Sequence, residues 1–88
     1  MKIIISGRAE KELKKIPKID QIIIAKKIRS IKESPALLNV EKLSGYKNIF
    51  RVRVSQYRIV YRKTVGEIYI ILIGHRKDIY HLVRQLFR

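Results

Sequence analysis

Arginines are the side chains of this sequence best suited to do chemistry. Arg51 and Arg53 stand two residues apart in one alternating segment, Arg58 follows in the next segment, and Arg76 comes just after a third. A guanidinium presents a planar fork of donors that matches phosphate oxygens, so several arginines on one surface would bind phosphate. A solvated charged surface is the alternative interpretation. Phosphate binding is favoured because residues 49–73 carry five basic groups and a single acid, and such a surface repels itself unless an anion is present.

Two histidines and a tyrosine lie close to Arg76 in the sequence. His75 flanks it, and a neutral imidazole could accept a proton near neutral pH; a loop histidine without a role is the alternative. His81 is expected to be exposed. Tyr80 directly follows the apolar Ile79 and so lies off the apolar stripe of a closing helix. Its ring could stack on a base or its hydroxyl could contact a phosphate, with ordinary packing as the alternative.

Length and composition exclude several classes of protein. With 88 residues, the chain has room for one core, so we expect one domain over residues 1–88 and exclude a two-domain cofactor enzyme. There is no Cys, and two His with seven acidic residues make a poor ligand set, so neither a disulfide nor a metal site nor a cofactor is expected. No apolar run approaches the roughly 20 residues of a membrane span, and no signal peptide is recognisable. We therefore expect a cytoplasmic protein that does not contact membranes.

The charge of the chain indicates a polyanionic partner. The formal net charge is +14. Residues 1–41 carry 10 basic and 5 acidic groups, whereas residues 42–88 carry 11 and 2. The second half is therefore the one expected to face the polyanion.

The first half of the chain has the pattern of a strand and two helices. Residues 2–6 predict a short strand, and residues 9–16 a helix that Pro17 ends. A second helix is expected from Lys18 to the Ser34-Pro35 pair. Its predicted core face consists of Ile19, Ile22, Ile23, Ile28 and Ile31. Residues 35–46 are expected to be a connecting segment without a strand.

After Gly45 the apolar residues no longer recur at helical spacing but at every second position. Phe50, Val52 and Val54 alternate with polar residues, which predicts a strand with one buried face and one wet cationic face. Tight turns at residues 55–56 and 65–67 would connect it to two more strands, the last of them apolar on both faces. A closing helix is expected to bury the apolar residues Ile79, Leu82, Val83, Leu86 and Phe87. Tyr57 and Tyr61 are expected in the core.

These elements define an α+β fold. We expect a mainly antiparallel sheet, made of the N-terminal strand and a three-strand meander. An N-terminal helical hairpin would pack on one face of the sheet, and a short helix would end the chain. The other face would be left open, with Arg51 and Arg53 on it.

Three stretches of the sequence resemble the RelE/ParE superfamily of toxins. They are Lys42–Gly45 with Phe50–Val54, the segment "YRIVY" at Tyr57–Tyr61, and the segment "GHRKDIY" at Gly74–Tyr80. Within the superfamily the sequence is most similar to RelE, so the resemblance implies a ribosome-dependent endoribonuclease. Such a toxin cuts mRNA in the ribosomal A site and is held inactive by an antitoxin, RelB.

The resemblance also implies roles for single residues. Arg51 and Arg53 fall where RelE enzymes carry two basic residues, and Arg58 and Arg76 match two arginines that hold the phosphate and the leaving group. Tyr80 matches a tyrosine that stacks on or orients the substrate, although the spacer before it is shorter than in bacterial RelE. Because arginine does not deprotonate, His75 or a ribosomal group is the expected acceptor of the 2′-OH proton.

Two alternatives keep the same surface and change the function. A ParE-like toxin would inhibit DNA gyrase by binding protein, without nuclease activity. A plain basic RNA-binding module is also compatible with the charge, but the aromatic-rich strand pattern of RNA recognition is missing. For the toxin we expect an acidic RelB-like antitoxin in a hetero-oligomer, with the ribosome and mRNA as further partners.

Overall fold

The computed structural model describes residues 1–33 and 40–86 of the chain. Its elements are β1 (Lys2–Ile5), α1 (Gly7–Lys15), α2 (Lys18–Glu33), β2 (Val40–Lys42), β3 (Ile49–Val54), β4 (Tyr57–Thr64), β5 (Glu67–His75) and α3 (Ile79–Leu86). The expected α+β class is confirmed, and so is the order of a strand, two helices, a meander and a closing helix.

The sheet has five strands in the order β1-β5-β4-β3-β2. β1 runs parallel to β5, and the other neighbours are antiparallel. The expectation of four strands is wrong, because β2 forms an edge strand inside the segment expected to be a connection. β2 has only three residues, of which two are charged, so it is too short to show an alternating pattern.

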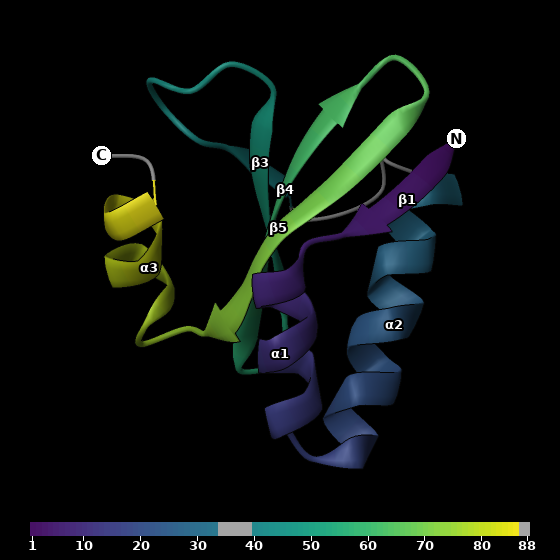
Figure 1. Ribbon diagram of the computed structural model, residues 1–88, viewed down its shortest axis with the longest axis vertical. Coiled ribbons are helices and arrows are strands. Elements are labelled where there is room, and N and C mark those ends of the chain that lie inside the picture. Colours follow the sequence, from purple (N-terminus) through teal and green to yellow (C-terminus); the bar gives the residue numbers. More distant parts are fainter. Residues whose placement is uncertain (34–39, 87–88) are drawn as a thin grey trace.

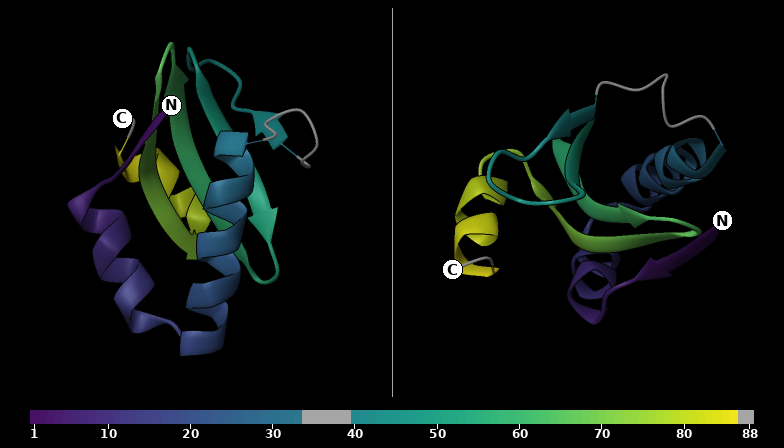
Figure 2. Two further views of the ribbon diagram at one scale, coloured as in Figure 1. Left: turned by 90° about the vertical axis from the view of Figure 1, so that its right-hand side faces the viewer. Right: turned by 90° about the horizontal axis from the view of Figure 1, so that it is seen from above.

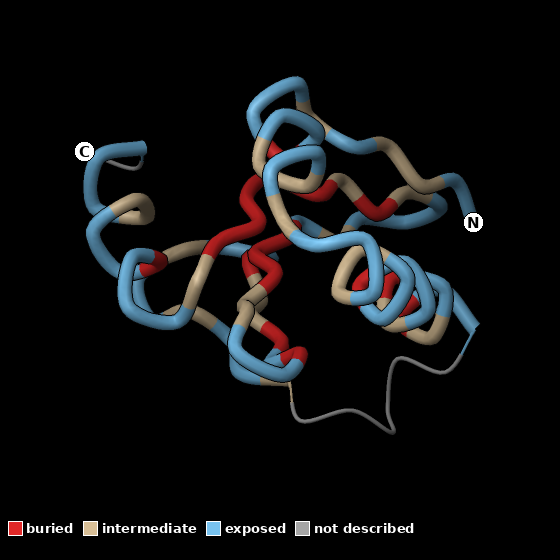
Figure 3. Tube along the Cα trace, turned by 90° about the horizontal axis from the view of Figure 1, so that it is seen from below, coloured by how far each residue is buried: buried red, intermediate tan, exposed pale blue. Residues whose placement is uncertain are grey.

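Helices cover both faces of the sheet. Figures 1 and 2 show α1 and α2 on one side of it and α3 on the other. We call these sides the hairpin face and the α3 face. The expectation that the second face is open is therefore wrong in part, since α3 covers one portion of it. The buried positions lie mostly along the strands, whereas most of the trace through the helices is exposed (Figure 3).

The hairpin face carries the larger apolar cluster. It joins residues of α1 and α2 to the inward residues of the strands. Its buried members are Ala9, Ile24, Ile28, Ile31, Val52, Val54, Ile59, Tyr61, Ile68, Ile70 and Ile73. The burial of Tyr61 and the packing of Tyr57 against this cluster confirm the expectation for both rings. Phe50, Val52 and Val54 also point to this face, as the alternation predicts.

The predicted core face of α2 is partly wrong. Ile28 and Ile31 are buried, together with Ile24. By contrast Ile19, Ile22 and Ile23 are 70%, 52% and 43% exposed. Apolar residues surround much of this helix, so spacing alone does not decide which of them face the sheet.

The α3 face carries a smaller cluster around Ile79, which is fully buried at the start of α3. Leu82 and Val83 pack against this cluster as expected, but Leu86 is 42% exposed. Phe87 lies outside the described residues. Gly74 on β5 favours the close packing of α3, since a Cβ atom at this position would lie 3.1 Å from Cδ1 of Leu82.

A β-bulge on β5 changes which face its residues point to. Val60 pairs with Leu72 and Tyr61 with Ile70, so Ile71 is an extra residue between them. The Ser6 hydroxyl donates to the carbonyl oxygen of Ile71 at 2.8 Å and also accepts from the first turn of α1. Ile71 and Leu72 both belong to the cluster under α3, so the alternation is reversed beyond this point.

Candidate active site

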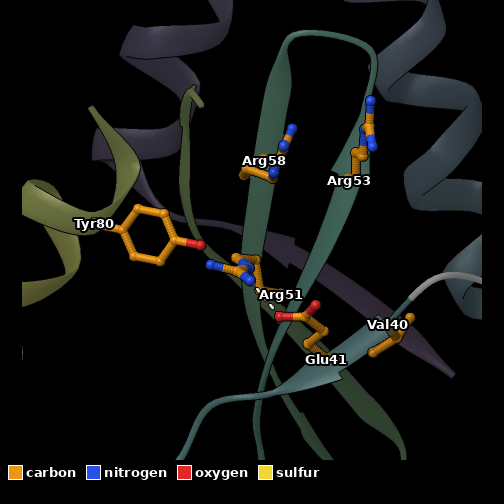
Figure 4. Close-up of a pocket in the computed structure, with 6 residues that line it drawn as sticks. All are labelled: Val40, Glu41, Arg51, Arg53, Arg58 and Tyr80. Atoms are coloured by element: carbon orange, nitrogen blue, oxygen red, sulfur yellow. Dashed lines mark hydrogen bonds and ion pairs between the residues drawn. The ribbon is translucent and has the colours of Figure 1, made fainter. Parts of the chain in front are cut away.

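A cavity of about 490 Å³ opens on the α3 face, beside α3. Six residues from three strands and one helix line it, namely Val40, Glu41, Arg51, Arg53, Arg58 and Tyr80. Figure 4 shows the three arginines on two adjacent strands, with Tyr80 reaching in from α3 and Glu41 from the edge strand.

Strand alternation places the arginines on one face. Arg51 and Arg53 alternate with the inward residues of β3, and Arg53 is the direct cross-strand partner of Arg58 on β4. Arg58 lies in turn opposite Gly74 on β5. Like charges directly opposite each other are unfavourable, so this arrangement stores repulsion that a bound anion would relieve.

Arg51 is held by two neighbours. Its guanidinium forms an ion pair with the carboxylate of Glu41, its cross-strand partner on β2. The same guanidinium lies over the Tyr80 ring, 4.8 Å from the centroid, in a cation–π contact. The side chain is only 14% exposed, so the wet environment expected for it is wrong, and its guanidinium is fixed in position.

Arg58 experiences the combined charge of the site. Desolvation lowers the pKa of Arg58, and the charges of Arg53, Arg51 and Arg76 lower it further. One Arg58 nitrogen donates to the carbonyl oxygen of Tyr57 at 3.0 Å. The remaining donors of its fork are thus available to a ligand in a strongly positive environment.

Five of the six residues expected from the sequence come together. Arg51, Arg53, Arg58 and Tyr80 line the cavity, and Tyr80 is 56% exposed, as its place off the apolar stripe predicts. Arg76 is close enough to affect Arg58 electrostatically. Its backbone N–H donates at 2.8 Å to the turn between β3 and β4, which fixes the chain at the edge of the site.

His75 is not brought to the cavity. Because of the bulge on β5 it points to the hairpin face, where its ring lies edge-on to Tyr57 with centroids 5.9 Å apart. Its Nδ1 accepts from the backbone N–H of Lys77 at 3.2 Å. The expectation that His75 flanks the basic surface rested on its place beside Arg76 in a loop. His75 is instead the last residue of β5, and the bulge at Ile71 sets the face to which it points. His81 is exposed, as expected.

Glu41 and Val40 are lining residues that the sequence did not reveal. Both belong to β2, the strand that was missed. The opposite charges of Glu41 and Arg51, which pair across neighbouring strands, are the feature of the sequence that could have indicated this edge strand. Over residues 1–33 and 40–86, no three His, Cys, Asp or Glu side chains are grouped so that they could hold a metal ion.

The chemistry of this cavity is that of an anion site. Three guanidiniums converge on one opening and a single carboxylate lies at its edge, so a phosphodiester would find several charge-assisted donors there. An exposed aromatic ring at the rim could contact a base or ribose. Arginine donors preorganised around a phosphate also stabilise charge that develops during phosphoryl transfer.

The fold of this chain belongs to a family of small toxins. Residues 3–80 match the family described as ParE toxin of type II toxin-antitoxin system, parDE. Since this match spans most of the chain, the chain belongs to that family and is the toxin of a type II toxin–antitoxin system. This confirms the resemblance to the RelE/ParE superfamily.

Individual relatives carry the name RelE. Toxin RelE3 of Methanocaldococcus jannaschii is 32% identical over 84 residues, which cover 91% of this chain and 96% of that protein. The RelB-RelE antitoxin-toxin complex from Methanococcus jannaschii contains a chain with a TM-score of 0.76 and 28% identity, covering 90% of this chain and 96% of that one. The intact RelBE complex of E. coli gives a TM-score of 0.71 at 25% identity, over 83% and 93% of the two chains.

Among the helices of the described ranges, none is long and apolar enough to cross a bilayer.

Proposed function

We propose that this toxin is a ribosome-dependent endoribonuclease that cuts mRNA in the ribosomal A site by metal-independent chemistry. The observation that carries the proposal is the cavity in which Arg51, Arg53 and Arg58 face one opening beside Tyr80. Arginines so close together repel one another, which destabilises the free protein. A bound phosphate would offset this repulsion. The toxin would act in the cytoplasm, where ribosomes translate.

The reaction would be an attack of a ribose 2′-OH on the adjacent phosphodiester. Such a site needs charge stabilisation and positioning more than a nucleophile of its own. Arg51, Arg53 and Arg58 would stabilise the negative charge on the pentavalent phosphate. Arg76, at the edge of the site, would stabilise the leaving 5′-oxygen, and Tyr80 would fix Arg51 and contact the substrate.

The test is primer extension on a defined message in a purified translation system, with and without ribosomes. The wild-type toxin should give breaks within the A-site codon only when ribosomes are present. Arg76→Ala should reduce these breaks about 10²-fold or more, the typical effect of removing one preorganised donor. Lys77→Ala removes a neighbouring exposed cation and serves as the matched control, which should cut normally.

A second function has one observation in its favour. The family to which the chain belongs is described by the name ParE, and a ParE-like toxin would inhibit DNA gyrase by binding it. The same experiment separates the two functions. If the message stays intact in every lane and the protein is still toxic in cells, gyrase inhibition is favoured over mRNA cleavage. The arginine cavity would then be a docking surface.

We also propose an acidic RelB-like antitoxin as the partner in a hetero-oligomer. The relatives from Methanococcus jannaschii and E. coli are complexes of RelE with RelB, and the net charge of +14 favours an acidic partner. On α2 the exposed side chains of Ile19, Ile22 and Ile23 offer an apolar surface between lysines. An amphipathic acidic segment that orders on binding would cover such a surface.

Titration of the toxin with the antitoxin encoded beside it tests this partner. Ile22→Ala should weaken binding about tenfold or more, as expected for an anchor residue. Val65→Ala is the control, because Val65 is fully exposed on the turn between β4 and β5. A neighbouring protein that is basic, or that forms no complex on coexpression, would contradict the proposal.

A further inference from the structure

The turn from β5 to α3 carries one residue of the candidate site and leads directly to another. Arg76 lies in this turn, and Tyr80 is the second residue of α3. The side chain of Arg76 is exposed, so its direction depends mainly on the backbone that carries it. A group that fixes the backbone of residues 75–78 therefore determines where the charge of Arg76 lies.

The three backbone N–H groups of residues 76–78 are all bound, two of them by His75. The N–H of Arg76 donates to the carbonyl oxygen of Gln56 at 2.8 Å. The N–H of Asp78 donates to the carbonyl oxygen of His75 at 2.9 Å, and the N–H of Lys77 donates to its Nδ1 at 3.2 Å. Only this last bond has a side-chain acceptor, so it is the one that a substitution can remove.

The imidazole that accepts this bond is itself held on the hairpin face. Tyr57, the cross-strand partner of His75 on β4, lies edge-on to it with the ring centroids 5.9 Å apart. Tyr57 packs against the larger apolar cluster, and its hydroxyl donates to a carboxylate oxygen of Asp20 on α2 at 3.4 Å. The imidazole therefore connects the core under the helical hairpin to the turn at the edge of the cavity.

The bond from Lys77 also defines the state of the ring. A backbone N–H is always a donor, so Nδ1 must be the acceptor, and the proton of the neutral ring lies on Nε2. A nitrogen occupied in this way, on the opposite side of the sheet from the cavity, is suited to holding backbone rather than to proton transfer.

We propose that His75 is a positioning residue, which keeps Arg76 at the candidate site by holding the backbone N–H of Lys77. The inference rests on the proposed nuclease function, in which Arg76 stabilises the leaving 5′-oxygen. A displacement of about 1 Å at such a group can lower the rate about 10²-fold. Water could replace the ring as the acceptor, but it is not attached to β5 and so does not fix the turn.

Two substitutions separate the acceptor of His75 from its ring. His75→Phe keeps an aromatic ring beside Tyr57 but has no acceptor. His75→Asn loses the ring, but its Oδ1 is bonded to Cγ as Nδ1 is in histidine, and asparagine accepts from the backbone N–H two residues on. In the ribosome assay His75→Phe should lower kcat about tenfold, with KM within twofold of the wild type. His75→Asn should keep kcat within about threefold of the wild type.

A role in stability alone would give the opposite order of the two variants. Phenylalanine retains the packing against Tyr57 and asparagine does not, so His75→Phe should be the more stable variant in urea unfolding although it is the slower enzyme. If His75→Asn cuts as slowly as His75→Phe, or if His75→Phe cuts like the wild type, the proposal is wrong.

A double-mutant cycle tests whether His75 acts through Arg76. Once Arg76→Ala has removed the guanidinium, adding His75→Phe should lower kcat less than twofold further. A further tenfold loss would mean that His75 acts on another group, and would overturn the assignment. His81→Phe is the matched control, because His81 is the other histidine of the chain and lies exposed on α3; it should cut like the wild type.

The same assay distinguishes failure of this inference from failure of the nuclease function. If the wild type itself does not cut, the nuclease function fails and the inference with it. If the wild type cuts, Arg76→Ala does not, and His75→Phe cuts at the wild-type rate, only the role of His75 fails.

Discussion

The two faces of the sheet bury and expose different kinds of residue, although both are built from the same strands. On the hairpin face, α1 and α2 enclose apolar side chains from β3, β4 and β5. On the α3 face, the shorter helix covers a smaller apolar cluster and leaves the cavity of three arginines beside it. Because side chains alternate along β3 and β4, the apolar residues that stabilise the fold lie on the hairpin face and the charged residues of the cavity lie on the α3 face. Neighbouring residues of one strand should therefore respond to substitution in opposite ways.

The largest effect on activity is expected at Arg58. Arg58→Ala removes a guanidinium aimed into the cavity, and cleavage should fall about 10³-fold, on the order of 4 kcal/mol of transition-state stabilisation. The free energy of unfolding should not fall, because repulsion from Arg53 and Arg51 is relieved. Cleavage assays and urea unfolding of the same preparation measure both quantities.

Arg62→Ala is the control for that substitution. Arg62 lies further along β4, and its guanidinium is over the ring of Tyr69 rather than in the cavity. Its removal should leave cleavage within a fewfold of the wild type. An equal loss for Arg62 and Arg58 would mean that general positive charge, and not the cavity, supports the activity.

Ile59 is the next residue along β4 and should show the reverse behaviour. It is fully buried in the cluster on the hairpin face, so Ile59→Ala should lower the free energy of unfolding by about 3 kcal/mol through lost burial and a residual cavity. Below the melting temperature, the folded fraction should still cut. Thermal unfolding followed by circular dichroism measures the loss. A stable Ile59→Ala protein without activity would break the division between the faces.

A smaller effect is expected where α3 approaches β5. In Gly74→Ala the added Cβ would lie 3.1 Å from Leu82 and 3.3 Å from Ile79, at their Cδ1 atoms. The helix should yield slightly, which costs about 1 kcal/mol of stability and moves Tyr80 relative to Arg51. We expect a few-fold loss of cleavage. Gly7→Ala, where a Cβ has nothing within 4 Å, is the control and should retain full activity.

The smallest effect is expected on the free energy of unfolding at alkaline pH. Burial raises the pKa of Tyr61 above its usual value. In the unfolded chain this phenol ionises near pH 10, so the wild type should lose stability as the pH rises from about 10 toward the folded-state pKa. Tyr61→Phe removes this contribution, and its stability should fall less steeply between pH 9 and 11. Parallel curves for the two proteins would show that Tyr61 does not contribute.

Much of the fold could be predicted because most elements are long enough to repeat an apolar spacing. Helix α3 has eight residues and strand β3 has six, and Ile79 and Val52 are buried as expected. Strand β2 could not be found, because three residues carry no period. The exposure of Ile19 and Ile22 was missed for another reason: α2 has apolar residues on more than one side, and tertiary packing selects among them.

For the candidate site too, residues on strands with a repeating pattern were found and the others were missed. Arg51, Arg53 and Arg58 were found because alternation along two strands fixes their face without further information. Glu41 was missed together with its strand. His75 was misplaced because its neighbour Arg76 does not reveal the face to which a residue points. β5 extends to His75, and the bulge at Ile71, which leaves no mark in an apolar run, decides that face. Local spacing could not reveal either of these features.

The bulge at Ile71 lets β5 carry one more residue than its partner without changing which side chain enters the site. The carbonyl oxygen of the extra residue accepts from the hydroxyl of Ser6, near the start of the chain. Deleting that residue would leave Gly74 opposite Arg58 and His75 opposite Tyr57, on the faces that they occupy now. Straightening the strand with all its residues kept would instead shift the pairing beyond the bulge by one residue and bring His75 to the face of the arginines. The bond from Ser6 therefore helps to keep an imidazole out of the cavity.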